Sequence, residues 1–171
     1  RRQVQLRQLI ASLHGIDPEQ VLIGNGAAEL FTWVGRDAAG CGLSVLPAPG
    51  FADYQRALQC WQADLREQLL PLHWGPSFPQ DHPDPGDGNV LWICNPHNPT
   101  GQLWSRASLE PLLQRFRLVI CDEAFLPLVP DGEAQSLIPL VASHPNLVVI
   151  RSLTKLYGIA GLRLGYAVGQ S

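Results

Sequence analysis

Short apolar runs alternate with amphipathic stretches along the chain. The runs are too short for helices and rich in branched residues, which is typical of buried strands; they lie at 21–23, 43–46, 90–94, 118–122 and 147–150. Helical patterns lie at 4–13, from the glycines at 24–26 to about 37, at 52–63 and at 105–116. This alternation predicts an α/β fold with a mainly parallel sheet. The last run, 164–168, follows too closely for a helical crossover, so we expect that strand to be antiparallel.

Composition narrows the class of protein. The chain has 171 residues, 46% hydrophobic, which suffices for one domain with a substantial core. Residues 71–88 are rich in proline and glycine and predict a surface loop. The net charge is -3 without a long basic run, and no apolar run reaches spanning length, so we expect neither a nucleic-acid nor a membrane partner.

The four cysteines form no C-x-x-C pair, and two of them lie inside apolar strand runs. We therefore expect neither a metal site nor a disulfide framework. Free cysteines in a core suit a reducing, cytoplasmic location.

One lysine stands directly after a predicted strand. Lys155 follows the run 147–150 on a short loop with Ser152 and Thr154, at the kind of strand end where α/β proteins bind ligands. The neighbouring Arg163 and partial burial would both favour loss of its proton, and a neutral amine attacks carbonyls. By itself, S-x-x-K also fits two ordinary solvated cations.

Other strand ends carry further candidates. The glycines at 24–26 precede a helix and could cradle phosphate, although the third glycine of a nucleotide-binding motif is missing. Phe51 could stack on a flat ligand or cap the core. Asn98 offers an amide, and His97 is interpreted as a loop residue rather than a base. Asp122 and Glu123 are adjacent, so one faces inward while the other is solvated or structural.

Five motifs, in this order, resemble those of the large domain of fold-type I, class I and II aminotransferases. They are residues 24–26 (Gly-Asn-Gly), 49–51 (Pro-Gly-Phe), 98–101 (Asn-Pro-Thr-Gly), 122–125 (Asp-Glu-Ala-Phe) and 152–155 (Ser-Leu-Thr-Lys), the last followed by 161–166 (Gly-Leu-Arg-Leu-Gly-Tyr). The resemblance implies a three-layer sandwich and pyridoxal 5'-phosphate as cofactor. It makes a nucleotide-binding module the remote alternative.

The resemblance also implies roles around the cofactor ring. Lys155 would form the Schiff base and later move a proton, while Asp122 would keep the pyridine nitrogen protonated. Asn98 would donate to the phenolic oxygen. Phe51 would stack on one ring face, with Ala124 against the other.

The phosphate group would be held by a second set of residues. By the resemblance, these are backbone amides and side chains of Gly26, Ala27, Ala28, Ser152, Thr154 and Arg163. Arg163 would make the charge-assisted contact.

Within the family, residues 51–58, 122–125 and 151–155 are similar to the histidinol-phosphate aminotransferase branch and, inside it, to threonine-phosphate decarboxylases. Phe125 stands where most relatives have tyrosine. We expect a decarboxylase acting on an amino-acid phosphate, with an aminotransferase for histidinol phosphate or another amino acid as the alternative. Residues 1–171 would form most of the cofactor-binding domain, without the N-terminal segment and the C-terminal small domain, and the complete protein would be a homodimer.

Overall fold

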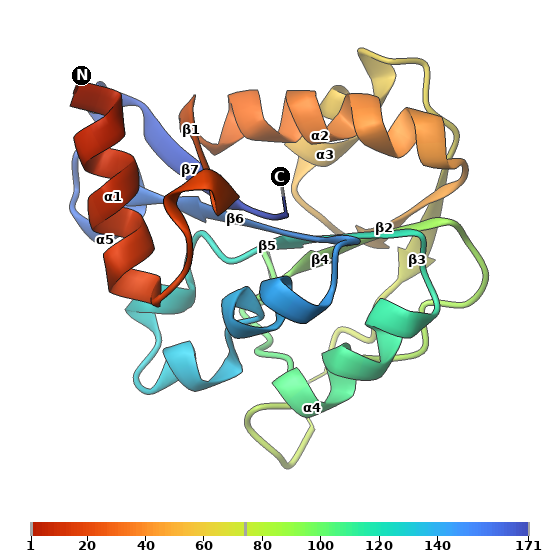
Figure 1. Ribbon diagram of the computed structural model, residues 1–171. Helices are drawn as coiled ribbons and strands as arrows, with labels where there is room; N and C mark the ends of the chain where they lie inside the picture. The colour runs from red at the N-terminus through yellow and green to blue at the C-terminus, as the bar shows by residue number, and fades with distance from the viewer. Residues whose placement is uncertain (1, 74, 171) are drawn as a thin grey trace.

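A seven-stranded sheet runs through the middle of the computed structural model, which describes residues 2–73 and 75–170 (Figure 1). The strands follow the order β1-β7-β6-β5-β4-β2-β3. Their bounds are β1 (Val21–Asn25), β2 (Ser44–Ala48), β3 (Leu65–Leu69), β4 (Val90–Cys94), β5 (Leu118–Asp122), β6 (Leu147–Ser152) and β7 (Leu164–Val168).

Strand β7 runs in the direction opposite to that of the other strands of this sheet. It pairs antiparallel with β6 and with β1, whereas β6, β5, β4, β2 and β3 pair in parallel. The predicted mainly parallel sheet with an antiparallel last strand is therefore confirmed. Because parallel strands share a direction, the carboxyl ends of β4, β5 and β6 meet at one edge of the sheet.

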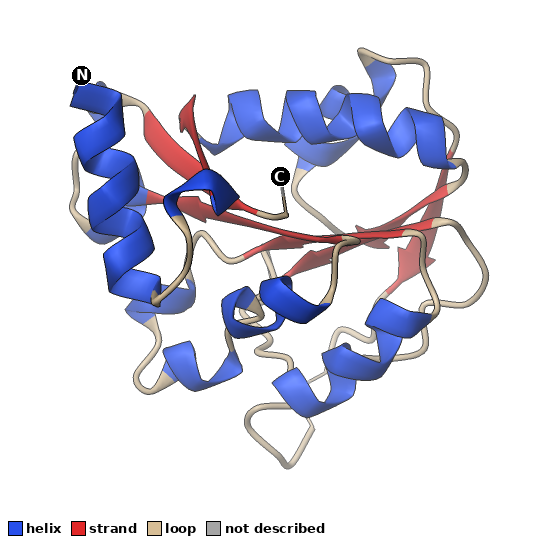
Figure 2. Ribbon diagram, viewed as in Figure 1, coloured by secondary structure: helices blue, strands red, loops and turns tan. Residues whose placement is uncertain are grey.

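Helices cover both faces, which gives the three predicted layers (Figures 1 and 2). On one face lie α2 (Ala27–Cys41) and α3 (Ala52–Gln59), which pack on Val90, Trp92 and Ile120. The other face is covered by α1 (Arg2–His14), α4 (Arg106–Leu109) and the 3-10 turns Glu110–Gln114 and Ile138–Ser143. A sheet buried on both faces explains the continuous apolar strands β4 and β5.

Two predicted helices are shorter or broken. The α3 helix ends at Gln59 rather than at residue 63. The pattern at 105–116 starts as predicted, with the Ser105 side chain accepting from the amide of Ser108, but the α-helix stops at Leu109. Pro111 lies in the 3-10 turn that follows, since a proline within the helix would remove a hydrogen bond.

One strand was not predicted. Strand β3 pairs only with β2, at the edge of the sheet. Its side chains hold the loop that follows: Arg66 donates to the carbonyl of Pro85 at 2.8 Å, and Gln68 to that of Asp84 at 3.0 Å. The predicted loop at 71–88 has no helix or named strand among its described residues, and Trp74 within it lies outside them. Across the described part of the chain, no helix is both long and apolar enough to cross a membrane.

Candidate active site

A cavity of about 220 Å³ lies where the carboxyl ends of β5 and β6 meet the first turn of α2. Every site residue predicted from the sequence lines it. The full lining is Gly26, Ala27, Ala28, Phe31, Phe51, Asp53, Asn98, Asp122, Ala124, Phe125, Ser152, Thr154, Lys155 and Arg163. Segments far apart in the sequence thus meet in one place.

One end of the cavity is suited to an anion. Helix α2 begins after Gly26, which has φ +78°. Because glycine has no side chain to cap the helix, it leaves the amides of the first turn free at this end of the cavity. The Arg163 guanidinium lies beside this turn, because a Cβ added to Gly26 would stand 3.1 Å from Arg163 Nη2. Gly165 brings β7 equally close, since its Cβ would lie 2.8 Å from the amide nitrogen of Ala27. A helix N-terminus and a guanidinium together attract phosphate.

Two hydroxyl groups lie close to each other at the end of β6. Ser152 and Thr154 are buried, and their side-chain oxygens are 2.7 Å apart. Both line the cavity. They therefore add donors next to the anion-binding end.

Lys155 differs from its predicted surroundings in two ways. It lies in the one-turn helix α5 (Leu153–Leu156) instead of a loop. It is also exposed, so the partial burial expected from the sequence is wrong. Its Nζ stands 5.3 Å from the centre of the Phe125 ring, which places the amine over an aromatic face at the cavity.

Asp122 ends β5 and is 5% exposed. Its Oδ2 accepts from the Tyr54 hydroxyl at 2.6 Å, and its Oδ1 accepts from the amide of Ala124 at 2.9 Å. Burial raises the pKa of this carboxyl to about 6, although the bond from Tyr54 opposes the rise. The charge of Lys155 also opposes the rise, and a further cation reaching this carboxylate would favour its charged form.

Tyr54 was not predicted as part of the site. Its ring is buried and packs edge-on against Phe31 and Phe51, at centroid distances of 5.1 and 5.6 Å. The signal in the sequence was its position three residues after Phe51, the N-cap of α3, because residues three apart lie on one side of a helix. Its contact with Asp122, 68 residues away, has no local signature.

The remaining residues lie on loops between strands and helices. Phe51 is 42% exposed, which places it at the cavity mouth rather than in the core. Asn98 lines the cavity from the loop after β4. His97 is a buried loop residue: its Nε2 lies 2.7 Å from the carbonyl oxygen of Pro49, and burial lowers its pKa. This contact joins the loops that carry Asn98 and Phe51.

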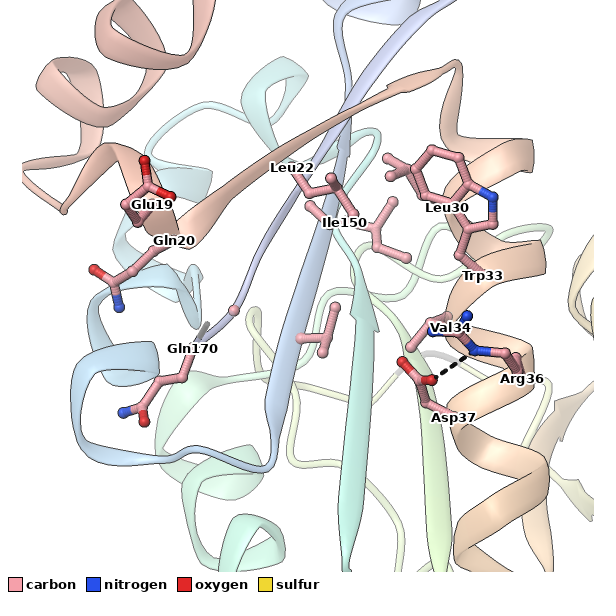
Figure 3. Close-up of a pocket in the computed structure, with 13 residues that line it drawn as sticks. Glu19, Gln20, Leu22, Leu30, Trp33, Val34, Arg36, Asp37, Ile150 and Gln170 are labelled. Carbon is pink, nitrogen blue, oxygen red and sulfur yellow. Dashed lines mark hydrogen bonds and ion pairs between the residues drawn. The ribbon is translucent and has the colours of Figure 1, made fainter. Parts of the chain in front are cut away.

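A larger cavity, of about 470 Å³, lies beside α2 over β6, β7 and β1 (Figure 3). Its lining is apolar over Leu22, Trp33 and Ile150, with Leu22 52% and Trp33 38% exposed. The Arg36–Asp37 ion pair stands at its edge. None of the predicted site residues lines it, so we interpret it as sheet surface that the helices leave uncovered. Among the described residues, no cluster of three or more His, Cys, Asp or Glu side chains could hold a metal ion.

Sequence comparison identifies the class of protein that this fold and cavity define. The model of the family "Aminotransferase class I and II" matches residues 1–171, and the chain belongs to that family. The chain spans about half the length of the curated relatives it matches. It is 33% identical to a histidinol-phosphate aminotransferase from Lactiplantibacillus plantarum, over 96% of this chain and 48% of the relative.

Solved structures agree with the fold. The L-threonine-O-3-phosphate decarboxylase from Porphyromonas gingivalis is 25% identical, with a TM-score of 0.78 over 98% of this chain and 50% of that one. The histidinol-phosphate aminotransferase from Sinorhizobium meliloti, solved in complex with pyridoxal-5'-phosphate, is 22% identical, with a TM-score of 0.77 over 98% of this chain and 47% of that one.

Proposed function

We propose that this chain binds pyridoxal 5'-phosphate in the cavity at the ends of β5 and β6 and forms most of the cofactor-binding domain of a family enzyme. The observation that carries the proposal is the gathering of a lysine, a buried carboxylate and an anion-binding helix end in one cavity. The cofactor needs these three groups at separate points, for its aldehyde, its ring nitrogen and its phosphate. The family membership of the chain supports the same cofactor.

The residues present fit the phosphate group. A side chain on Gly26 would crowd Arg163, so the glycine leaves the guanidinium and the amides of Ala27 and Ala28 free to converge on one anion. Ser152 would add a hydroxyl donor, and Thr154 would orient that hydroxyl through their 2.7 Å contact.

The residues around the ring have complementary tasks. Asp122 would hold a proton on the ring nitrogen, and that cation would in turn favour the charged carboxylate. Asn98 would donate to the phenolic oxygen, with Phe51 and Ala124 on the two ring faces. The Lys155 amine would bind the aldehyde and then carry a proton to or from the substrate's α-carbon. The bound cofactor supplies an electron sink for the bond that breaks.

The substrate class that we propose is a phosphorylated amino compound. Decarboxylation of threonine phosphate is our first candidate reaction, on the resemblance of residues 51–58 and on Phe125, which faces Lys155 Nζ at 5.3 Å. Transamination of histidinol phosphate is the second, on the 33% identity to an enzyme of that name. We further propose that a C-terminal small domain, an N-terminal segment and a second copy of the chain complete the site.

Cofactor attachment is tested by titrating the protein with pyridoxal 5'-phosphate and treating it with borohydride. Visible absorbance should appear, and reduction followed by peptide mapping should place the adduct on Lys155, the one lysine in the sequence. Lys155→Arg keeps a cation at this position but cannot bond covalently to the aldehyde, so it distinguishes binding by charge from covalent attachment. An adduct of wild-type yield in Lys155→Arg refutes the assignment.

The reaction is tested by giving the complete protein each substrate in turn. Carbon dioxide and aminopropanol phosphate from threonine phosphate support the decarboxylase. Formation of glutamate, with histidinol phosphate as amino donor and 2-oxoglutarate as acceptor, supports the aminotransferase. The 171-residue chain alone should bind the cofactor more weakly than the complete protein, and equal affinity would contradict the proposed missing parts.

A further inference from the structure

A buried ion pair lies on the far side of the two strands that carry Asp122 and Ser152. Glu123 follows Asp122 and Arg151 precedes Ser152, and adjacent residues of a strand point to opposite faces. Arg151 Nη2 lies 2.6 Å from Glu123 Oε2, and Nε lies 2.9 Å from the same oxygen. The side chains are 3% and 0% exposed.

The Glu123 carboxylate is fully engaged with fixed donors. Besides Arg151, it accepts from the Ser136 hydroxyl at 2.8 Å and from the amide of Leu137 at 2.7 Å. The Arg151 guanidinium in turn donates to Ser136 and to Glu133, the latter at 2.7 and 3.1 Å. Because hydrogen bonds are directional, these contacts hold the carboxylate and the guanidinium in one arrangement.

The pair is also tied to the backbone at the cavity. Asp122 stands opposite Ile150 in the β5–β6 ladder, and the Glu123 amide donates to the Ile150 carbonyl at 2.8 Å. Immediately after Glu123, the Ala124 amide turns back to Asp122. Movement of Glu123 relative to Arg151 would therefore displace the Asp122 carboxylate relative to Ser152.

Stability alone explains such a pair poorly, because apolar residues of similar volume are often as stabilising as a buried ion pair. We propose that Glu123 and Arg151 are positioning residues, which fix the distance between the ring end and the phosphate end of the cavity. This inference rests on the proposed function, since it takes Asp122 and Ser152 as contacts for the two ends of one cofactor.

The first test compares Glu123→Gln with Glu133→Gln. Both lose a carboxylate that binds Arg151, but the Glu133 side chain is 56% exposed and lies outside the cavity lining. Glu123→Gln should raise the Kd for pyridoxal 5'-phosphate about tenfold, which is the size of effect seen in metal sites when a residue that orients a ligand is lost. Glu133→Gln should change this Kd less than about twofold. Equal effects of the two substitutions overturn the proposal.

The second test separates positioning from stability. The double variant Glu123→Leu/Arg151→Met removes both buried charges. Its thermal midpoint should therefore lie closer to the wild-type value than that of Glu123→Gln does. Hydrogen exchange of the Ala124 amide in the unliganded chain should still be faster than in the wild type, measured against the Val119 amide in β5. If Ala124 protection returns along with the midpoint, the pair serves stability only and the proposal fails.

These measurements test the proposed cofactor binding and the positioning role of Glu123 and Arg151 separately. A wild-type chain that neither absorbs nor retains the cofactor after borohydride refutes the proposed function. The Ala124 exchange rates need no cofactor, so they support or overturn the positioning role in either case.

Discussion

Asp122 connects local electrostatics with stability. Its pKa is about 6 in the folded chain against an ordinary value of 3.8, so folding favours its protonated form. That stabilisation is complete below pH 3.8 and is lost as the pH rises to about 6. Asp122→Asn should therefore gain stability relative to the wild type across this window, by about 3 kcal/mol in all.

Urea unfolding from pH 4 to 8 measures this difference. Asparagine keeps an oxygen for the Ala124 amide and an amide for the Tyr54 hydroxyl, so packing should be retained. Asp37→Asn, at an exposed carboxylate, is the matched control and should shift stability by less than about 0.5 kcal/mol. Parallel stability curves for Asp122→Asn and the wild type would contradict the raised pKa.

Tyr54→Phe should act on the same carboxyl in the opposite sense. Removing the hydroxyl deprives the charged carboxylate of its 2.6 Å donor, so the pKa of Asp122 should rise further. We expect a loss of about 1.5–3 kcal/mol at pH 7.5, where a charged group loses a bond, and a smaller loss at pH 4.5. Chemical unfolding at the two pH values checks this, and a larger loss in acid would show that the hydroxyl serves the protonated form.

Among the elements, helix α2 offers a test that compares its N-cap, Gly26, with a glycine inside the helix. Gly26→Ala puts a Cβ at φ +78° and 3.1 Å from Arg163, so it should cost about 1–3 kcal/mol and weaken cofactor binding by displacing the guanidinium. Gly40 lies inside α2 with open space around it, so Gly40→Ala should stabilise the protein by about 0.5–1 kcal/mol. Thermal unfolding and cofactor titration of both variants check this, and equal cofactor affinity in the two variants would contradict a role for Gly26 beside Arg163.

Elements with a strong apolar pattern could be predicted from the sequence. Strands β4 and β5 begin and end at the predicted residues, because burial on both faces leaves a continuous apolar run. Strand β3 escaped prediction because an edge strand needs little apolar character. Its residues Arg66 and Gln68 serve a loop instead of the core.

The site was predictable where motifs carry it and not where only folding brings residues together. Lys155, Asp122 and Arg163 stand in recognisable motifs, and the structure places them in one cavity. Tyr54 matters through its contact with Asp122, which no local spacing reveals. Gly165 stands in a recognisable motif, but its close approach to Ala27 is likewise visible only in the fold. The exposure of Lys155 likewise depends on what surrounds it in space.

For the whole molecule, the uncovered sheet surface beside α2 has a thermodynamic consequence. Leu22 and Trp33 are 52% and 38% exposed in the folded chain, so part of their apolar surface is hydrated before unfolding begins. Unfolding then exposes less new apolar surface at these two side chains. At about 0.45 cal/mol/K for each Å² of apolar surface, they lower the heat capacity change of unfolding by only on the order of 0.1 kcal/mol/K, which leaves it within the usual ~12–15 cal/mol/K per residue. Calorimetry should therefore give a value in that range, and a value clearly below it would mean that much more of the apolar surface is hydrated in the folded chain.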